Sequence, residues 1–265
     1  MAQNKRPPLI IAHRGASAAA PENTLAAFRH AIDAGADGIE LDVRLASDGV
    51  AVVIHDPDLK RTAGVEGRVS SYSSDELAHF DVGTWFGRSR PEITGRFSDQ
   101  KVLPLKTTLS AIADFRGFIY IEMKCKSNDA EPLAVAVADA LKTAETAGTV
   151  IVKSFRMAAV SHIRRFCPDV RTAALFAPKI RTLLRKEKYL VKIAHELGVD
   201  ELSLHYSLVT RKLMKKAAKR GLPVTVWTAD NPRWVKKAIK LGLNAIITND
   251  PELLLKRRAE LTSAA

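Results

Sequence analysis

Eight short apolar runs alternate with longer amphipathic stretches, and this alternation restricts the fold more than any other feature of the sequence. The runs have strand length and fall at 9–13, 38–43, 118–124, 149–154, 171–176, 201–205, 223–228 and 244–248. Stretches with helical apolar spacing lie between most of them, at 23–35, 131–148, 157–166, 181–198, 211–221, 233–242 and 255–260. Several of these end in glycine, which commonly closes a helix. The pattern predicts an α/β fold, a (β/α)8 TIM barrel.

A ninth apolar run, "VAVVIHD" at 50–56, fits the barrel only as the second arm of a hairpin. Asp48-Gly49 precedes it and is a strong hairpin-turn signal, and the interval after residue 43 is too short for a helix. The hairpin would fold His55 back towards Asp42 at the C-terminal mouth of the barrel. A doubly wound open sheet is the alternative, but no glycine-rich dinucleotide loop follows the first strand.

Residues 57–103 are rich in glycine, serine and charge, and they fit poorly as barrel core. The stretch is too long for an ordinary loop, so we interpret it as a small inserted lid-like subdomain or a mobile segment. It follows a strand's C-terminal end, which would place it on the active-site face. No linker separates two domains, so residues 1–265 are expected to form a single TIM-barrel catalytic domain.

Composition indicates a cytoplasmic protein with a packed core. Hydrophobic residues make up 46% of the chain, and no apolar run approaches the ~20 residues that a membrane helix needs. The N-terminal residues lack a signal-peptide core. The two cysteines, Cys125 and Cys167, have no metal-type spacing and suggest a reducing compartment.

The formal net charge of +12 comes largely from basic residues in the late helical stretches. Solvated helix faces are the simplest explanation. Attraction to an anionic surface or a phosphorylated substrate is the alternative, and peripheral membrane contact stays open with it. No nucleic-acid-binding module is recognisable, so no nucleic-acid partner is expected. Nothing in the sequence sets an oligomeric state.

Ionisable side chains stand where the apolar strands end, which is where barrel enzymes build their sites. Glu40 and Asp42 lie two residues apart and therefore point the same way from one strand, as Glu122 and Lys124 do from another. Three carboxylates pointing into one pocket would repel each other unless a cation lay between them. Oxygen ligands favour one divalent ion, Mg²⁺ or Ca²⁺, with Mn²⁺ as an alternative. The competing interpretation is ion pairing of the carboxylates with Arg14, Arg44 and Lys124.

His13 and His55 fit an acid–base pair beside such a site, because histidine exchanges protons near neutral pH. Arg14 and Lys124 supply the fixed positive charge that a phosphate group needs. The set suggests displacement at phosphorus. Ser154 ends a strand, but its neighbours form no nucleophile elbow, so ester hydrolysis by an activated serine is disfavoured.

Several motifs together resemble the glycerophosphodiester phosphodiesterase family. They span residues 10 to 251 in the family's order and read "HRG", "PENTLAAF", "DGIELDVRLASDGVAVVIHD", "IEMK", "KSF", "VTVWT" and "IITNDP". The resemblance implies a barrel with an insertion after the HD motif. It also implies Glu40, Asp42 and Glu122 as metal ligands, and His13 and His55 as the catalytic acid and base.

The same resemblance implies that Arg14 and Lys124 bind the substrate phosphate and that Trp227 lines a glycerol pocket. It brings in Glu22 as a substrate-site residue that orients the region of His13 and Arg14 by hydrogen bonding. Asn23 and Thr24 are expected to cap the first helix. Two departures from the family, "ADNP" after "VWT" and Lys106 after the insertion, bear on substrate choice.

The expected function is metal-dependent hydrolysis of glycerophosphodiesters to sn-glycerol 3-phosphate and an alcohol. Phospholipase D-like hydrolysis of lysophospholipids is an alternative that uses the same fold and carboxylates. A non-catalytic protein that binds phosphorylated ligands through its basic surface is an alternative of another class.

Overall fold

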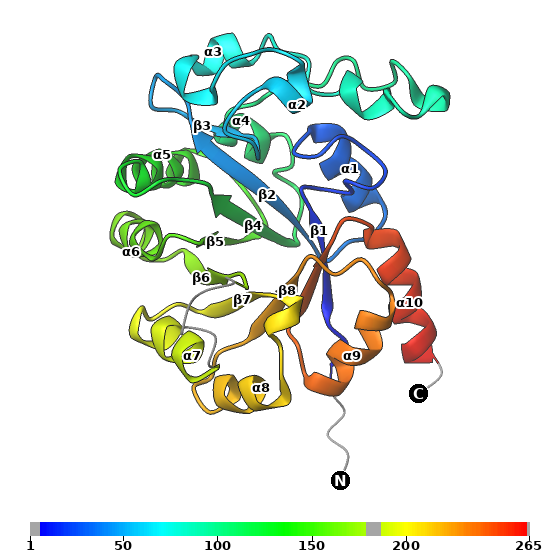
Figure 1. The fold of residues 1–265 in the computed structure, drawn as a ribbon, viewed down its shortest axis with the longest axis vertical. Coiled ribbons are helices and arrows are strands. Elements are labelled where there is room, and N and C mark those ends of the chain that lie inside the picture. Colours follow the sequence, from blue (N-terminus) through cyan, green and yellow to red (C-terminus); the bar gives the residue numbers. More distant parts are fainter. Residues whose placement is uncertain (1–5, 179–186, 264–265) are drawn as a thin grey trace.

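The computed structural model describes residues 6–178 and 187–263. Eight parallel strands close into a barrel that helices surround (Figure 1), because β1 pairs with both β2 and β9. The barrel strands are β1 Leu9–His13, β2 Gly38–Leu45, β4 Phe118–Met123, β5 Thr149–Ser154, β6 Arg171–Phe176, β7 Glu201–His205, β8 Val224–Trp227 and β9 Ala245–Thr248. The predicted TIM barrel is confirmed.

The main helices pack their apolar faces against the outside of the barrel. They are α1 Leu25–Asp33, α4 Leu105–Ser110, α5 Ala130–Thr143, α6 Met157–Phe166, α7 Glu187–Glu196, α8 Arg211–Ala218, α9 Arg233–Leu241 and α10 Pro251–Ser263. Leu133 and Val137 of α5, for example, are fully buried one turn apart. The first part of the helix predicted at 181–198, up to residue 186, lies outside the described residues. No described helix combines the length and apolar character needed to cross a membrane.

The predicted hairpin forms after β2. β3, Ala51–Val53, pairs antiparallel with β2 and lies outside the ring. Gly49 has a φ of +80° in the turn, a backbone angle that glycine adopts without strain. The Ile54 amide donates to the Asp42 carbonyl at 3.0 Å, so the next residue, His55, comes back to the end of β2 as expected.

The insertion between β3 and α4 contains short helices around its own apolar cluster of Val69, Leu77, Val82 and their neighbours. Its elements are α2 Lys60–Ala63, η1 Val69–Ser71, α3 Ser74–Leu77, η2 Thr84–Gly87 and η3 Pro91–Ile93. In Figure 1 it lies along one side of the ring beside β3 and does not cross the centre. Gln100 Oε1 accepts from the Ala26 amide at 3.0 Å, which ties the insertion to α1. Its role as a lid stays a prediction.

The barrel interior changes from apolar to charged along the strands. Buried apolar residues, among them Ile11, Tyr120 and Ile151, fill the part of the interior that lies away from the C-terminal ends of the strands. Two residues further along their strands come Glu122 after Tyr120 and Lys153 after Ile151. Side chains two apart on a strand face the same side. The charged groups therefore gather at the C-terminal mouth of the barrel.

Candidate active site

Glu40, Asp42 and Glu122 meet at the mouth of the barrel. One oxygen from each lies within 4.8 Å of the others, and all three residues are buried. β2 pairs with β4 so that Asp42 stands opposite Glu122, and this register brings the two strands' carboxylates together. All-oxygen donors at such spacing are the set that a hard divalent cation binds.

Three cations of the chain surround this carboxylate cluster. Lys124 Nζ lies 2.5 Å from Glu122 Oε1 and 3.2 Å from Asp42 Oδ1, and Arg14 Nε lies 3.0 Å from Asp42 Oδ2. The third is Lys153 of β5, whose Nζ lies 2.9 Å from Glu40 Oε1. Arg44, an expected partner under the ion-pair interpretation, instead donates to the backbone carbonyls of His55 and Lys124.

These cations do not neutralise the cluster evenly. Burial would raise the pKa of Asp42, but Lys124 and Arg14 hold it well below its usual value. Burial raises the pKa of Glu122 to about 7, against the opposing effect of Lys124, and the charge of Asp42 adds to the rise. Glu122 therefore resists ionisation at neutral pH even beside a lysine. The cluster can accept further positive charge, so the residues present fit a divalent ion.

Asn23 holds Asp42 in place. Its side-chain amide donates to Asp42 Oδ2 and its Oδ1 accepts from the Asp42 amide, both at 3.0 Å. Asn23 has a φ of +59°, a left-handed angle that asparagine tolerates better than most residues. The expectation that Asn23 caps the first helix is wrong. Thr24 alone is the N-cap, since its Oγ1 accepts from the Ala27 amide.

The "HRG" sequence turns the chain sharply at the end of β1. Arg14 has a φ of +57°, its amide donates to Glu40 Oε2 at 3.1 Å, and its guanidinium lies between Asp42 and Glu22. The next residue, Gly15, has a φ of +79°, and a Cβ there would lie 2.5 Å from the carbonyl carbon of Ala27. Only glycine fits this turn, and the turn directs Arg14 into the site.

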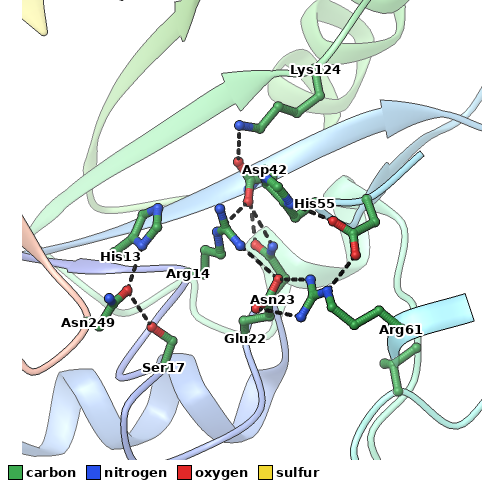
Figure 2. Close-up of polar contacts among 12 residues, drawn as sticks. His13, Arg14, Ser17, Glu22, Asn23, Asp42, His55, Arg61, Lys124 and Asn249 are labelled. Carbon is green, nitrogen blue, oxygen red and sulfur yellow. Dashed lines mark hydrogen bonds and ion pairs between the residues drawn. The ribbon is translucent and has the colours of Figure 1, made fainter. Parts of the chain in front are cut away.

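The two histidines are held by different partners. His13 Nδ1 lies 2.7 Å from Asn249 Oδ1, and His55 Nδ1 lies 2.7 Å from Asp56 Oδ1. In Figure 2 the two rings lie on either side of Asp42. Because Nδ1 of each ring is engaged by the chain, Nε2 is the nitrogen that remains to exchange a proton with a substrate. The His13 Nε2 lies 4.0 Å from Glu40 Oε2, at the edge of the carboxylate cluster.

A chain of ion pairs runs from the insertion into the site (Figure 2). Arg61 contacts Asp56 Oδ2 at 2.6 Å and Glu22 Oε1 at 2.7 Å, and Glu22 in turn contacts Arg14 at 2.9 Å. This series of ion pairs thus links Asp56, the partner of His55, with Arg14. Glu22 contacts Arg14 directly, and its role in orienting the region of His13 and Arg14 stays a prediction. Arg61 was missed from the sequence because it lies 39 positions from Glu22, within a segment without strand or helix periodicity.

Trp227 lies at the end of β8 among other aromatic residues. Its ring packs edge-on against Phe155 and against His205, with centroids 5.4 Å apart in both pairs. The indole Nε1 is buried and has no hydrogen-bond partner among the described residues. The apolar face that the sequence analysis assigns to glycerol is thus present at the mouth, and its contact with substrate stays a prediction.

Lys153 is a second residue of this site that the sequence analysis missed. Its side chain is fully buried and its ammonium faces Glu40. "IVKSF" reads as an ordinary strand with a lysine and a serine at its end. The available signal was the position of Lys153 two residues after Ile151, on the inward face at the charged ends of the strands.

Replacing Lys153 with methionine is expected to lower the free energy of unfolding by about 3–5 kcal/mol, because it leaves the buried Glu40 carboxylate without its nearest cation. Urea unfolding in EDTA measures the change. The double variant with Lys153→Met and Glu40→Gln removes both charges and should recover most of the loss. A single variant as stable as wild type would show that the pair does not stabilise the fold.

Charged side chains and two histidines gather at the carboxyl ends of the parallel strands, which is the end where enzymes with a (β/α)8 barrel carry their active sites. The model of the glycerophosphoryl diester phosphodiesterase family matches residues 13–253, and the chain belongs to that family. It is therefore an enzyme of the phosphoric diester hydrolase class.

Individual relatives match over nearly the whole chain. A glycerophosphodiester phosphodiesterase from Caldanaerobacter subterraneus is 32% identical, covering 93% of this chain and 96% of its own. A solved glycerophosphodiester phosphodiesterase from Thermotoga maritima has a TM-score of 0.73 at 26% identity, covering 95% and 98%. An Oleispira antarctica phosphodiesterase, solved with the product sn-glycerol-3-phosphate, has a TM-score of 0.83 at 24% identity, covering 95% and 96%. This last likeness concerns the fold.

Proposed function

We propose that this enzyme hydrolyses glycerophosphodiesters to sn-glycerol 3-phosphate and an alcohol, with one divalent cation, Mg²⁺, Ca²⁺ or Mn²⁺, and two histidines. The observation that carries the proposal is the buried cluster of Glu40, Asp42 and Glu122 with His13 and His55 beside it. Membership of the family and the activity named for the Caldanaerobacter relative support the substrate class. The free cysteines fit a cytoplasmic location.

Glu40, Asp42 and Glu122 would hold the ion, which when bound neutralises charge that grows on the phosphoryl oxygens. Arg14 and Lys124 add fixed positive charge at the same place. Arg14 is held by Glu22 and by the backbone turn, so its position does not depend on the substrate. A group fixed before binding loses little entropy when the transition state forms.

The partners of the two histidines set their tautomers. Asp230 accepts from the side-chain amide of Asn249 at 2.8 Å, so Asn249 presents its oxygen to His13, whose Nδ1 must donate. Neutral His13 therefore offers an unprotonated Nε2. His55 Nδ1 faces the Asp56 carboxylate, which stabilises the ring when it gains a proton. We assign proton removal from the nucleophile to one ring and protonation of the leaving alkoxide to the other.

Burial lowers the pKa of His55, and the opposing charge of Asp42 limits that shift. A histidine that releases its proton readily near neutral pH suits general acid–base chemistry. His55 is about one third exposed, which leaves it open to substrate. The ring can therefore exchange protons without a change in the fold.

The enzyme should release sn-glycerol 3-phosphate from glycerophosphocholine in the presence of Mg²⁺ or Ca²⁺, as a coupled glycerol 3-phosphate dehydrogenase assay measures. The same assay with glycerophosphoethanolamine and glycerophosphoglycerol gives the range of alcohols released. Lysophosphatidylcholine, assayed by choline release, is expected to be a poor substrate. No product from any diester with any of the three ions would contradict the proposed function, and faster turnover of the lysolipid would favour the phospholipase D-like alternative.

A further inference from the structure

A groove lined by positive charge opens from the carboxylate cluster on the side of β2, β4 and β5. A cavity of about 420 Å³ reaches Glu122 at its inner end and is walled by Phe155 and Pro57. A second cavity of about 260 Å³ lies beside it and shares part of its lining. Five cationic side chains line the two cavities: Arg44, Arg68, Lys124, Lys126 and Arg156. Glu122 and Asp129 are the two carboxylates in the lining. We call this the basic groove.

Most of these cations have no counterion. Within the described residues, no carboxylate lies at ion-pair distance from Arg44, Arg68, Lys126 or Arg156. The site arginines outside the groove, Arg14 and Arg61, do contact carboxylates. Solvated lysines on a helix face often lack partners, but here the unpaired charges converge on one hollow that connects to the active site.

Arg44 shows that the groove is more than a set of surface charges. It is half-buried, and its guanidinium donates to the backbone carbonyls of His55 at 2.7 Å and Lys124 at 3.4 Å. The guanidinium of Arg68 lines the same two cavities as Arg44. A fixed, partly desolvated cation beside a second guanidinium is stabilised by an anion that both can contact.

The position of the groove indicates which part of a substrate enters it. This step rests on the proposed function. With the phosphodiester at the carboxylate cluster and glycerol against Trp227 on the β8 side, the other alcohol leaves towards β2 and β4. Phe155 marks the boundary, since its ring touches Trp227 on one side and lines the groove on the other. The leaving alcohol therefore lies among unpaired cations.

We propose that the basic groove binds the leaving alcohol and selects glycerophosphodiesters whose alcohol carries a second phosphate group. A phosphate monoester offers three acceptor oxygens and about two negative charges, which match Arg44, Arg68 and Arg156 better than a neutral or cationic head group does. A choline head group would bring a positive charge into the same hollow and would bind there more weakly than a phosphorylated alcohol.

Glycerophosphoinositol and glycerophosphoinositol 4-phosphate test the proposal, because they differ by one phosphate. Release of sn-glycerol 3-phosphate is measured for both with the same divalent ion. The wild-type enzyme should have a kcat/KM at least roughly tenfold higher for the phosphorylated substrate, about the effect of one charge-assisted hydrogen bond. Arg68→Gln and Arg156→Gln should each reduce that ratio several-fold, because each removes a positive charge that the added phosphate would contact.

Lys215→Gln on α8 is the matched control, because it removes one exposed positive charge outside the groove and should leave the ratio unchanged. Equal kcat/KM for the two substrates would overturn the groove's role. The same drop in Lys215→Gln would overturn it too, by showing that net charge alone attracts the substrate. Absence of product from both inositol diesters, in an enzyme that hydrolyses glycerophosphocholine, would also overturn it. Absence of product from every diester would instead contradict the proposed function.

Discussion

Turnover of glycerophosphocholine is expected to fall by roughly 10²–10⁴-fold when His55 is replaced by alanine, the usual contribution of a positioned acid or base. His13→Ala is expected to have an effect of the same order. Each substitution removes Nε2, which is the one ring nitrogen that the chain does not engage in a close hydrogen bond. Both rings are partly exposed, so neither truncation opens a cavity in the core. The measurement is kcat at saturating substrate and ion.

His79→Ala is the matched control for these histidine variants. His79 is exposed in the insertion, where its Nδ1 contacts the Asp75 carbonyl, and it faces no carboxylate of the cluster. The His79→Ala enzyme should turn over glycerophosphocholine as fast as the wild-type enzyme does. The pH profile adds a second readout, because an alanine variant that loses its acid or base also loses one limb of the bell-shaped curve. A folded His55→Ala enzyme with ordinary turnover would remove that ring from the mechanism.

Asp56 is expected to act through His55 and not on the substrate. Asp56→Asn keeps the size of the side chain but removes the charge that stabilises a protonated ring. We therefore expect kcat to fall by roughly tenfold or more with little change in KM, because the substrate's own contacts remain. A change confined to KM would show that Asp56 acts mainly by holding Arg61 and the insertion in place.

The sequence predicts those parts of the site that depend on local periodicity. Glu40 and Asp42 stand two apart on a strand, so their common direction follows from the pleat, whatever the rest of the chain does. The Asp48-Gly49 turn leaves little choice about where the next strand goes, and His55 arrives beside β2 as expected. Barrel closure then brings Glu122 to the same mouth.

The parts that could not be predicted depend on contacts between distant segments or on unusual backbone angles. Asn249 meets His13 across 236 positions, and no local pattern marks either as the partner of the other. Lys153 stands one residue before the end of β5, where a polar residue is ordinary, and its burial depends on the Glu40 carboxylate that its ammonium contacts. The left-handed angles of Arg14 and Asn23 are strained conformations that only the assembled site holds in place. The sequence therefore indicates the proposed acid and base more readily than the groups that contact them.

Removal of divalent ions with EDTA is expected to abolish turnover, and Mg²⁺, Ca²⁺ or Mn²⁺ should restore it. The three carboxyl groups meet at one point, and burial raises the pKa of Glu122 to about 7 in spite of the nearby lysine. An ion at a hundred times its Kd stabilises the folded state by about 2.7 kcal/mol, a rise in Tm of roughly 5–10 °C for a chain of this size. Thermal unfolding with and without the ion measures this separately from catalysis.

Glu122→Gln tests whether the ion acts at this cluster. The substitution keeps the shape of the side chain but removes one ligand charge. The ion-induced rise in Tm should therefore fall to a small fraction of the wild-type rise, and turnover should be lost. Glu201→Gln is the matched control, since Glu201 is also fully buried in the barrel but is bound by Tyr120 and Asn244 outside the cluster. Its response to the ion should equal that of wild type. An equal rise in Tm in Glu122→Gln would place the ion elsewhere, and turnover that survives EDTA would mean that Arg14, Lys124 and Lys153 suffice to neutralise the phosphate.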